Sequence, residues 1–139
     1  MKYLGIDYGT KRIGIAISDD EGRVAFPLMT VPAGPKALSG IVELAKKNRV
    51  QKFVVGESRN FKGTPNPVME DIEQFKKDLE ELSGLPVAYE QEFLTSAAAA
   101  RQYTPEEKTR QVAPSQEKLD AAAAALILQS YLDKNRDTI

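Results

Sequence analysis

The sequence predicts an α/β fold built on a mixed five-stranded sheet, with three antiparallel strands, then two parallel strands, and helices on its flanks. Three short runs of strand-forming residues fall within the first 31 positions, separated by residues typical of turns. Helical and extended patterns then alternate, which is typical of parallel strands joined by helical crossovers. The length of 139 residues fits a single domain over residues 1–139.

The first three strands are expected at residues 3–6, 13–17 and 24–31, where β-branched and aromatic residues are frequent. Residues 7–10 and 19–22 lie between these strands and contain glycine and aspartate, which tight turns favour. Consecutive strands joined by such short turns pair as antiparallel hairpins.

The second part of the chain has the predicted order helix, strand, helix, strand, helix, helix. These elements are expected at residues 38–45, 53–56, 68–82, 86–90, 95–103 and 119–132. The strand at 53–56 is uniformly apolar, so we expect both of its faces to be buried. The helix at 68–82 has the clearest stripe, with Val68, Ile72, Phe75, Leu79 and Leu82 on one face.

Neither histidine nor cysteine occurs in the chain, and this excludes many kinds of site. Disulfides, thiolate nucleophiles, zinc ribbons and Ser-His-Asp triads are impossible. Any catalysis must rest on carboxylates, lysine, arginine, tyrosine, serine or threonine, and carboxylates suit hard cations such as Mg²⁺ or Mn²⁺. The longest apolar run, residues 121–128, is shorter than the ~20 residues that cross a membrane. The amino terminus lacks an apolar signal segment, so we expect a cytoplasmic protein with no membrane partner.

The charges are distributed unevenly, although the formal net charge is only -1. Residues 46–62 carry six basic residues and one acid, whereas residues 70–92 carry eight acids and two lysines. The acidic stretch is typical of a solvated helix face. The basic stretch is a candidate contact for the phosphate groups of a nucleic acid.

Asp7 ends the first apolar strand. The simpler interpretation is a turn residue that accepts local backbone N–H groups. Lys11 and Arg12 follow within the same turn and are suited to meeting an anion. Asp7 is therefore also a candidate site residue, if further carboxylates lie close to it.

Two such carboxylates are Glu92 and Asp120. Glu90 and Glu92 share one face at the carboxyl end of a predicted parallel strand, where ligands of open α/β sheets gather; the alternative is exposure at a strand–loop junction. Asp120 lies in the first turn of the last predicted helix, where the helix dipole alone favours an acid. It also lies on an apolar stripe with Ala123, Ala124, Ile127 and Tyr131, and a buried charge needs a partner or a metal ion. Asp7, Glu92 and Asp120 could therefore converge on Mg²⁺ or Mn²⁺, as in metal-assisted phosphoryl transfer.

Three segments carry a resemblance to a known family. The segment 4–19, LGIDYGTKRIGIAISD, is similar to the opening motif of the YqgF family, also called RuvX, the Holliday-junction-resolvase-like family. Val54-Val55-Gly56 resembles the second family motif, and Lys118-Leu119-Asp120 with the alanines that follow resembles the closing helix motif.

This resemblance implies a ribonuclease H-like fold and a metal-dependent nuclease that processes the 5′ end of the 16S rRNA precursor. An older proposal for the family is resolution of Holliday junctions in DNA. The family's three acids fall on Asp7, Glu92 and Asp120 as catalytic metal ligands, with two Mg²⁺ or Mn²⁺ ions expected once substrate is bound. The chain has Gln91-Glu92-Phe93 where the family usually has Asp-Glu-Arg. After Gly56 the family tends to have a proline two positions on, and this chain has Glu57-Ser58-Arg59 instead.

Basic residues near these motifs are the candidate nucleic-acid contacts. They are Lys11, Arg12, Arg59, Lys108, Arg110 and Lys118. Lys108 and Arg110 lie in an irregular segment, residues 104–115, for which a short helix and a plain surface loop both remain open. The expected partner is precursor rRNA, with branched DNA as the alternative, and the expected assembly is a monomer or a weak homodimer.

Two other functions remain open. ATPases of the actin and sugar-kinase type begin with a similar strand and turn, but they duplicate the fold, whereas this chain contains one copy. A catalytically inert RNA-binding or ribosome-assembly module is the second alternative. It predicts that Asp7→Asn leaves binding and function unchanged.

Overall fold

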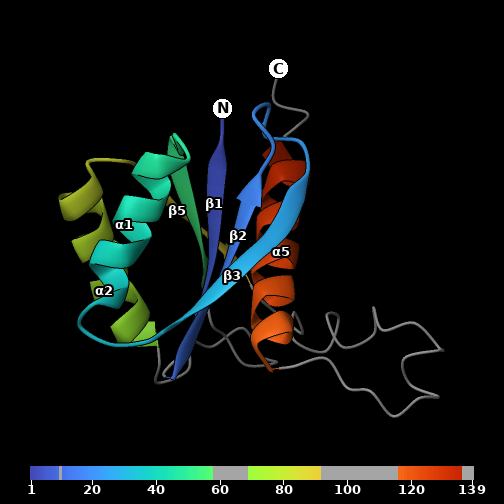
Figure 1. Cartoon of the computed structure of the whole chain (residues 1–139). Coiled ribbons are helices and arrows are strands. Elements are labelled where there is room, and N and C mark those ends of the chain that lie inside the picture. The colour runs from blue at the N-terminus through green and yellow to red at the C-terminus, as the bar shows by residue number, and fades with distance from the viewer. Residues whose placement is uncertain (10, 58–68, 92–115, 136–139) are drawn as a thin grey trace, which may run out of the picture.

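The computed structural model describes residues 1–9, 11–57, 69–91 and 116–135 (Figure 1). Its strands are β1 Tyr3–Tyr8, β2 Arg12–Ser18, β3 Ala25–Pro32, β4 Lys52–Glu57 and β5 Val87–Gln91. Its helices are α1 Ala37–Lys47, α2 Met69–Ser83 and α5 Gln116–Asn135. The helix expected at residues 95–103 and the segment 104–115 lie outside the described residues.

The strands form one sheet in the order β3-β2-β1-β4-β5. β1 pairs antiparallel with β2, and β2 pairs antiparallel with β3. β4 is parallel to both β1 and β5, and α1 lies in the connection between the antiparallel and the parallel strands. The predicted mixed sheet is therefore confirmed.

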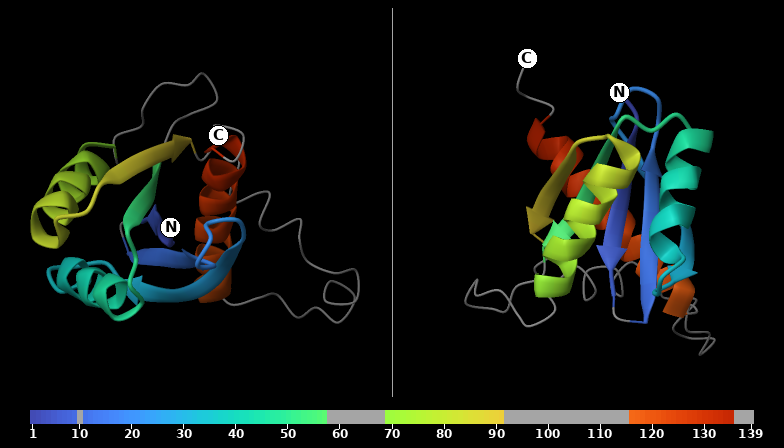
Figure 2. Two further views of the ribbon diagram at one scale, coloured as in Figure 1. Left: turned by 90° about the horizontal axis from the view of Figure 1, so that it is seen from above. Right: turned by 90° about the vertical axis from the view of Figure 1, so that its left-hand side faces the viewer.

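The helices cover both faces of the sheet. Figure 2 shows α1 and α2 together on one face and α5 on the other. α1 buries Ala37, Ile41, Val42 and Ala45, which share one side of the helix. In α2 the predicted stripe residues Ile72, Phe75 and Leu79 are buried, and Val68 lies outside the described residues. Leu82 is 51% exposed because it lies in the last turn, one residue before the helix ends. None of the helices in the described ranges is long and apolar enough to span a membrane.

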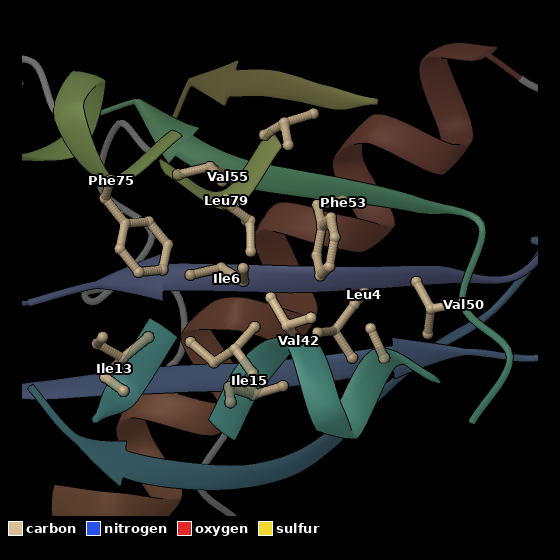
Figure 3. Close-up of a cluster of buried hydrophobic side chains, with 14 of the residues drawn as sticks. Leu4, Ile6, Ile13, Ile15, Val42, Val50, Phe53, Val55, Phe75 and Leu79 are labelled. Carbon is tan, nitrogen blue, oxygen red and sulfur yellow. The ribbon is translucent and has the colours of Figure 1, made fainter. Parts of the chain in front are cut away.

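Each face of the sheet has its own apolar cluster. The larger cluster packs against α1 and α2, and Figure 3 labels Leu4, Ile6, Ile13, Ile15, Val42, Val50, Phe53, Val55, Phe75 and Leu79 from it. The smaller cluster packs against α5 and contains Ala16, Val54, Ala124, Ile127, Leu128 and Leu132. Phe53, Val54 and Val55 are all fully buried, which confirms the prediction that β4 is buried on both faces.

α5 packs unusually close to the sheet because two glycines face it. A Cβ added to Gly14 would lie 2.0 Å from the carbonyl oxygen of Asp120, and one added to Gly5 would lie 2.7 Å from the Cβ of Leu128. Small residues on the helix, among them Ala124, complete this contact. The position of α5 therefore depends on the absence of side chains at these two positions of β1 and β2.

We expect Gly14→Ala to lower the free energy of unfolding by about 1–3 kcal/mol, because the added methyl group would collide with the α5 backbone. Gly40→Ala in α1 is the matched control. Its Cβ would meet nothing within 4 Å, and alanine in a helix interior is favoured over glycine by ~0.8–1 kcal/mol. Urea unfolding followed by circular dichroism measures both variants, and equal midpoints would contradict this account of α5 packing.

Candidate functional site

The side chain of Asp7 faces α5. Ile6 belongs to the cluster on the opposite face, and Tyr8 packs against that cluster. Because successive side chains of a strand alternate between faces, Asp7 points to the face that α5 covers, like Gly5 beneath Leu128. Asp7 is half-buried and lies at the carboxyl end of β1, which is where the sequence predicts a site.

Glycines flank Asp7 on both neighbouring strands. Gly14 of β2 is directly opposite Asp7. β1 and β4 are parallel, and Ile6 pairs with Val55. The next residues along the two strands are Asp7 and the buried Gly56, which therefore lie side by side. Neither neighbour contributes a side chain, so the space beside the Asp7 carboxylate on this face is not filled by its own strand neighbours.

α5 brings Asp120 to the same place. Its carbonyl oxygen lies over Gly14, the residue opposite Asp7. The apolar stripe predicted for Asp120 is confirmed, since Ala124 is fully buried and the Asp120 side chain is only 20% exposed. The predicted position in the first helical turn is wrong: α5 begins at Gln116, because residues 116–119 are good helix formers, and Asp120 falls in the second turn.

Arg12 makes an ion pair with Asp120. Its Nε donates to Oδ2 of Asp120 at 2.8 Å, although the two residues are 108 positions apart in the chain. Arg12 is in β2 two residues before Gly14, and both residues therefore lie on the α5 face of the sheet. The candidate site thus takes a carboxylate from β1, a guanidinium from β2 and a carboxylate from α5.

The other predicted site residues are placed only in part. Lys11 is exposed in the turn between β1 and β2, close to Arg12 in the chain. Lys118 lies in α5, two residues before Asp120, and its side chain lies outside the described part. Four predicted site residues lie outside the described residues altogether: Arg59, Glu92, Lys108 and Arg110.

Part of the basic stretch lies away from this site. Lys46 and Lys47 end α1, and Lys52 begins β4 beside Tyr3, the first residue of β1. Figure 1 shows the end of α1 near the amino terminus of the chain, at the opposite end of the sheet from the β1–β2 turn. These lysines therefore do not surround Asp7 and Asp120.

Glu90 is a buried acid that the sequence does not distinguish from an exposed one. Its side chain is only 6% exposed, accepts a hydrogen bond from the Ser130 hydroxyl, and receives the Lys134 ammonium at 2.6 Å. Glu90 pairs with Gly56 of β4, so it lies in the same row across the sheet as Asp7, about 10 Å away at two strand spacings. Ser130 and Lys134 lie one helical turn apart on α5, 40 and 44 positions from Glu90, so no local sequence pattern indicates this contact.

A hollow of about 290 Å³ lies on the other face, between α1 and α2. Tyr8, Asp71, Phe75 and Asp78 are among the residues that line it. Burial, and secondarily the charge of Asp71, raises the pKa of the Tyr8 phenol. Because its charged groups are carboxylates, this hollow is unsuited to phosphate and is distinct from the Asp7 site.

The donor set at the Asp7 site consists of oxygen atoms. Asp7 and Asp120 supply carboxylates, and among the residues that the structure describes no third acidic side chain completes a group of three. The third candidate, Glu92, directly follows β5 in the chain. Oxygen ligands of this type fit Mg²⁺ or Mn²⁺ and not a soft metal.

The fold is that of the ribonuclease H-like resolvases. The Thermus thermophilus RuvC structure matches with a TM-score of 0.59 and 18% identity, and the match covers 99% of this chain and 98% of the RuvC chain. T. thermophilus RuvC in complex with Holliday junction substrate matches with a TM-score of 0.60 and 17% identity, over 99% of this chain and 97% of its own. The structure of the fowlpox virus Holliday junction resolvase matches with a TM-score of 0.57 and 17% identity, over 96% of this chain and 99% of its own.

The chain belongs to the RuvX family, whose model, described as Holliday junction resolvase, matches residues 1–134. A relative from Streptococcus sanguinis (strain SK36), named "Putative pre-16S rRNA nuclease", is 38% identical over 141 residues, which cover 97% of this chain and 99% of the relative. A relative of the same name from Chloroflexus aggregans (strain MD-66 / DSM 9485) is 38% identical over 138 residues, 96% of this chain and 94% of the relative. The resemblance found in the sequence is confirmed.

We expect Lys134→Met to destabilise the fold by about 1–3 kcal/mol, because it leaves the buried Glu90 carboxylate without its ammonium partner. Combining it with Glu90→Gln should recover most of this loss, because the amide needs no counter-ion. Lys2→Met is the control: its contact with Asp20 is 3.6 Å long, Asp20 is 92% exposed, and such pairs contribute ~0–1 kcal/mol. Urea unfolding at neutral pH measures all three, and equal losses for the two lysine variants would contradict the role of the pair.

Proposed function

We propose that this protein is a metal-dependent nuclease that hydrolyses phosphodiester bonds in the precursor of 16S rRNA, in the processing of its 5′ end. The observation that carries the proposal is that α5 brings Asp120, paired with Arg12, over the residue that lies opposite Asp7 in a ribonuclease H-like sheet. Carboxylates serve a hard cation, and the guanidinium serves a phosphate. The names of the relatives supply the substrate class.

Asp7, Asp120 and Glu92 are the residues proposed to hold Mg²⁺ or Mn²⁺, with two ions when nucleic acid is bound. Once bound, the metal supplies an activated water and stabilises the charge that develops on the phosphate. The attacking group is then water, so no side chain of this protein has to act as a nucleophile. This agrees with a chain that contains neither cysteine nor histidine.

The chain's own residues position the reacting groups. The β1–β2 pairing fixes Asp7 opposite Gly14, and the close packing of α5 on Gly14 fixes Asp120 beside it. Arg12 and the exposed Lys11 are proposed to bind the phosphate backbone at the same edge of the sheet. Further backbone contacts are proposed for Arg59, Lys108, Arg110 and Lys118. Because such contacts release counter-ions, nucleic-acid affinity should fall as salt increases.

The test offers three substrates to the purified protein: 16S rRNA precursor with its 5′ extension, single-stranded RNA and a four-way DNA junction. Each is incubated with Mn²⁺, with Mg²⁺ and with EDTA. We expect metal-dependent cleavage of the precursor RNA. Asp7→Asn or Asp120→Asn should slow it by about 100-fold or more, since each tenfold corresponds to ~1.36 kcal/mol and the metal contributes several. Asp20→Asn, at a carboxylate that is 92% exposed, is the matched control.

The other outcomes separate the alternatives. Cleavage that survives EDTA or Asp7→Asn would show a contaminating nuclease and remove the support for the metal site. Cleavage of the DNA junction alone would favour a resolvase. RNA binding without cleavage, unchanged by Asp7→Asn, would favour an inert assembly module.

A further inference from the structure

We propose that Arg12 exchanges partners during substrate binding. In this structure its guanidinium holds Asp120, and when a divalent cation binds Asp120 the guanidinium transfers to a phosphate of the nucleic acid. This inference rests on the proposed function and adds a property to it, namely that metal binding and nucleic-acid binding strengthen each other through one side chain.

The ion pair is placed for such an exchange. The Nε–Oδ2 distance of 2.8 Å is that of a charge-assisted hydrogen bond, so the guanidinium occupies one oxygen of a proposed metal ligand. The Arg12 side chain is 39% exposed, which leaves it free to move toward solvent. Within the described residues, Nε is the only guanidinium nitrogen of Arg12 that donates a hydrogen bond, so the paired Nη groups, which match a phosphate, are available.

Electrostatics make the two occupants of Asp120 compete. A cation that approaches this carboxylate meets the positive charge of Arg12 a few ångströms away, and the repulsion weakens its binding. A phosphate beside the site attracts Arg12 and lowers that repulsion. By thermodynamic linkage the effect is reciprocal, so the metal must raise phosphate affinity by the factor by which phosphate raises metal affinity.

A purely structural ion pair would behave differently. Arg12 is in β2 and Asp120 in α5, so the pair also ties the helix to the sheet. If that were its whole role, loss of Arg12 would leave Asp120 less well oriented. Metal affinity would then stay the same or fall.

The first experiment measures Mn²⁺ affinity by isothermal titration calorimetry without nucleic acid. We expect Arg12→Gln to bind Mn²⁺ roughly two- to fivefold more tightly than the wild type, the range that a partly exposed ion pair allows. Arg23→Gln is the control, because it removes an equal charge from a pair with Glu21 in the β2–β3 turn. Arg12→Lys, a second variant that keeps the charge, should fall between wild type and Arg12→Gln. Unchanged or weaker Mn²⁺ binding in the Arg12 variants would overturn the exchange.

The second experiment measures binding of single-stranded RNA in EDTA, where no cleavage occurs. Asp120→Asn should tighten RNA binding because it releases Arg12, and this gain should shrink at least twofold when Arg12→Gln is already present. Loss of repulsion between Asp120 and RNA would act equally in both backgrounds, so the double-mutant cycle isolates the exchange. Equal gains would overturn it.

The two proposals can fail separately. If Mn²⁺ and RNA behave as expected but no substrate is cleaved, the nuclease function fails and the exchange stands. If Mn²⁺ binds neither wild type nor Arg12→Gln, the exchange fails together with the metal site. If cleavage occurs and the Mn²⁺ affinities are equal, only the exchange fails.

Discussion

The close contact between α5 and the sheet is the constraint on which the site depends. It exists because Gly5 and Gly14 have no side chains where they face the helix, and because the helix packs against them with small residues such as Ala124. At this separation the backbone of Asp120 lies directly on Gly14 of β2, the residue that pairs with Asp7. A larger residue at Gly14 would move the helix outward and separate the two acids. Packing density and site geometry are therefore set by the same contact.

The two faces of the sheet differ in what they bury. The face covered by α1 and α2 holds the larger apolar cluster, to which most of the buried apolar residues in the described part belong. The face covered by α5 holds a smaller cluster together with the buried Glu90 and the partly exposed Arg12–Asp120 pair. Successive residues of β1 serve the two faces in turn, so that Asp7 belongs to the site while Ile6 and Tyr8 belong to the main core. Polar groups can be concentrated on one face because the other provides the stability.

Much of this arrangement follows from local patterns in the chain. Hairpin strands, the helical stripe of α2 and the fully apolar β4 each depend on near neighbours, and the sequence shows them directly. Asp7 is recognisable because it ends a strand beside a glycine-containing turn. The partnership of Arg12 with Asp120 is not recognisable in this way, because 108 positions separate them and only the register of α5 on the sheet brings them together. The burial of Glu90 likewise depends on Ser130 and Lys134, which no pattern within β5 can show.

The long separation between Arg12 and Asp120 also has a consequence for folding during synthesis. The strands and helices of the first 91 residues can begin to pair before the final helix has left the ribosome, since their contacts are made among themselves. Until α5 docks, the face that carries Asp7 lacks Asp120 and leaves Ala16 and Val54 without their helix partners. Closing so long a loop is slow compared with forming local hairpins. The proposed metal site therefore forms only when α5 docks on the sheet, after the local strand pairings.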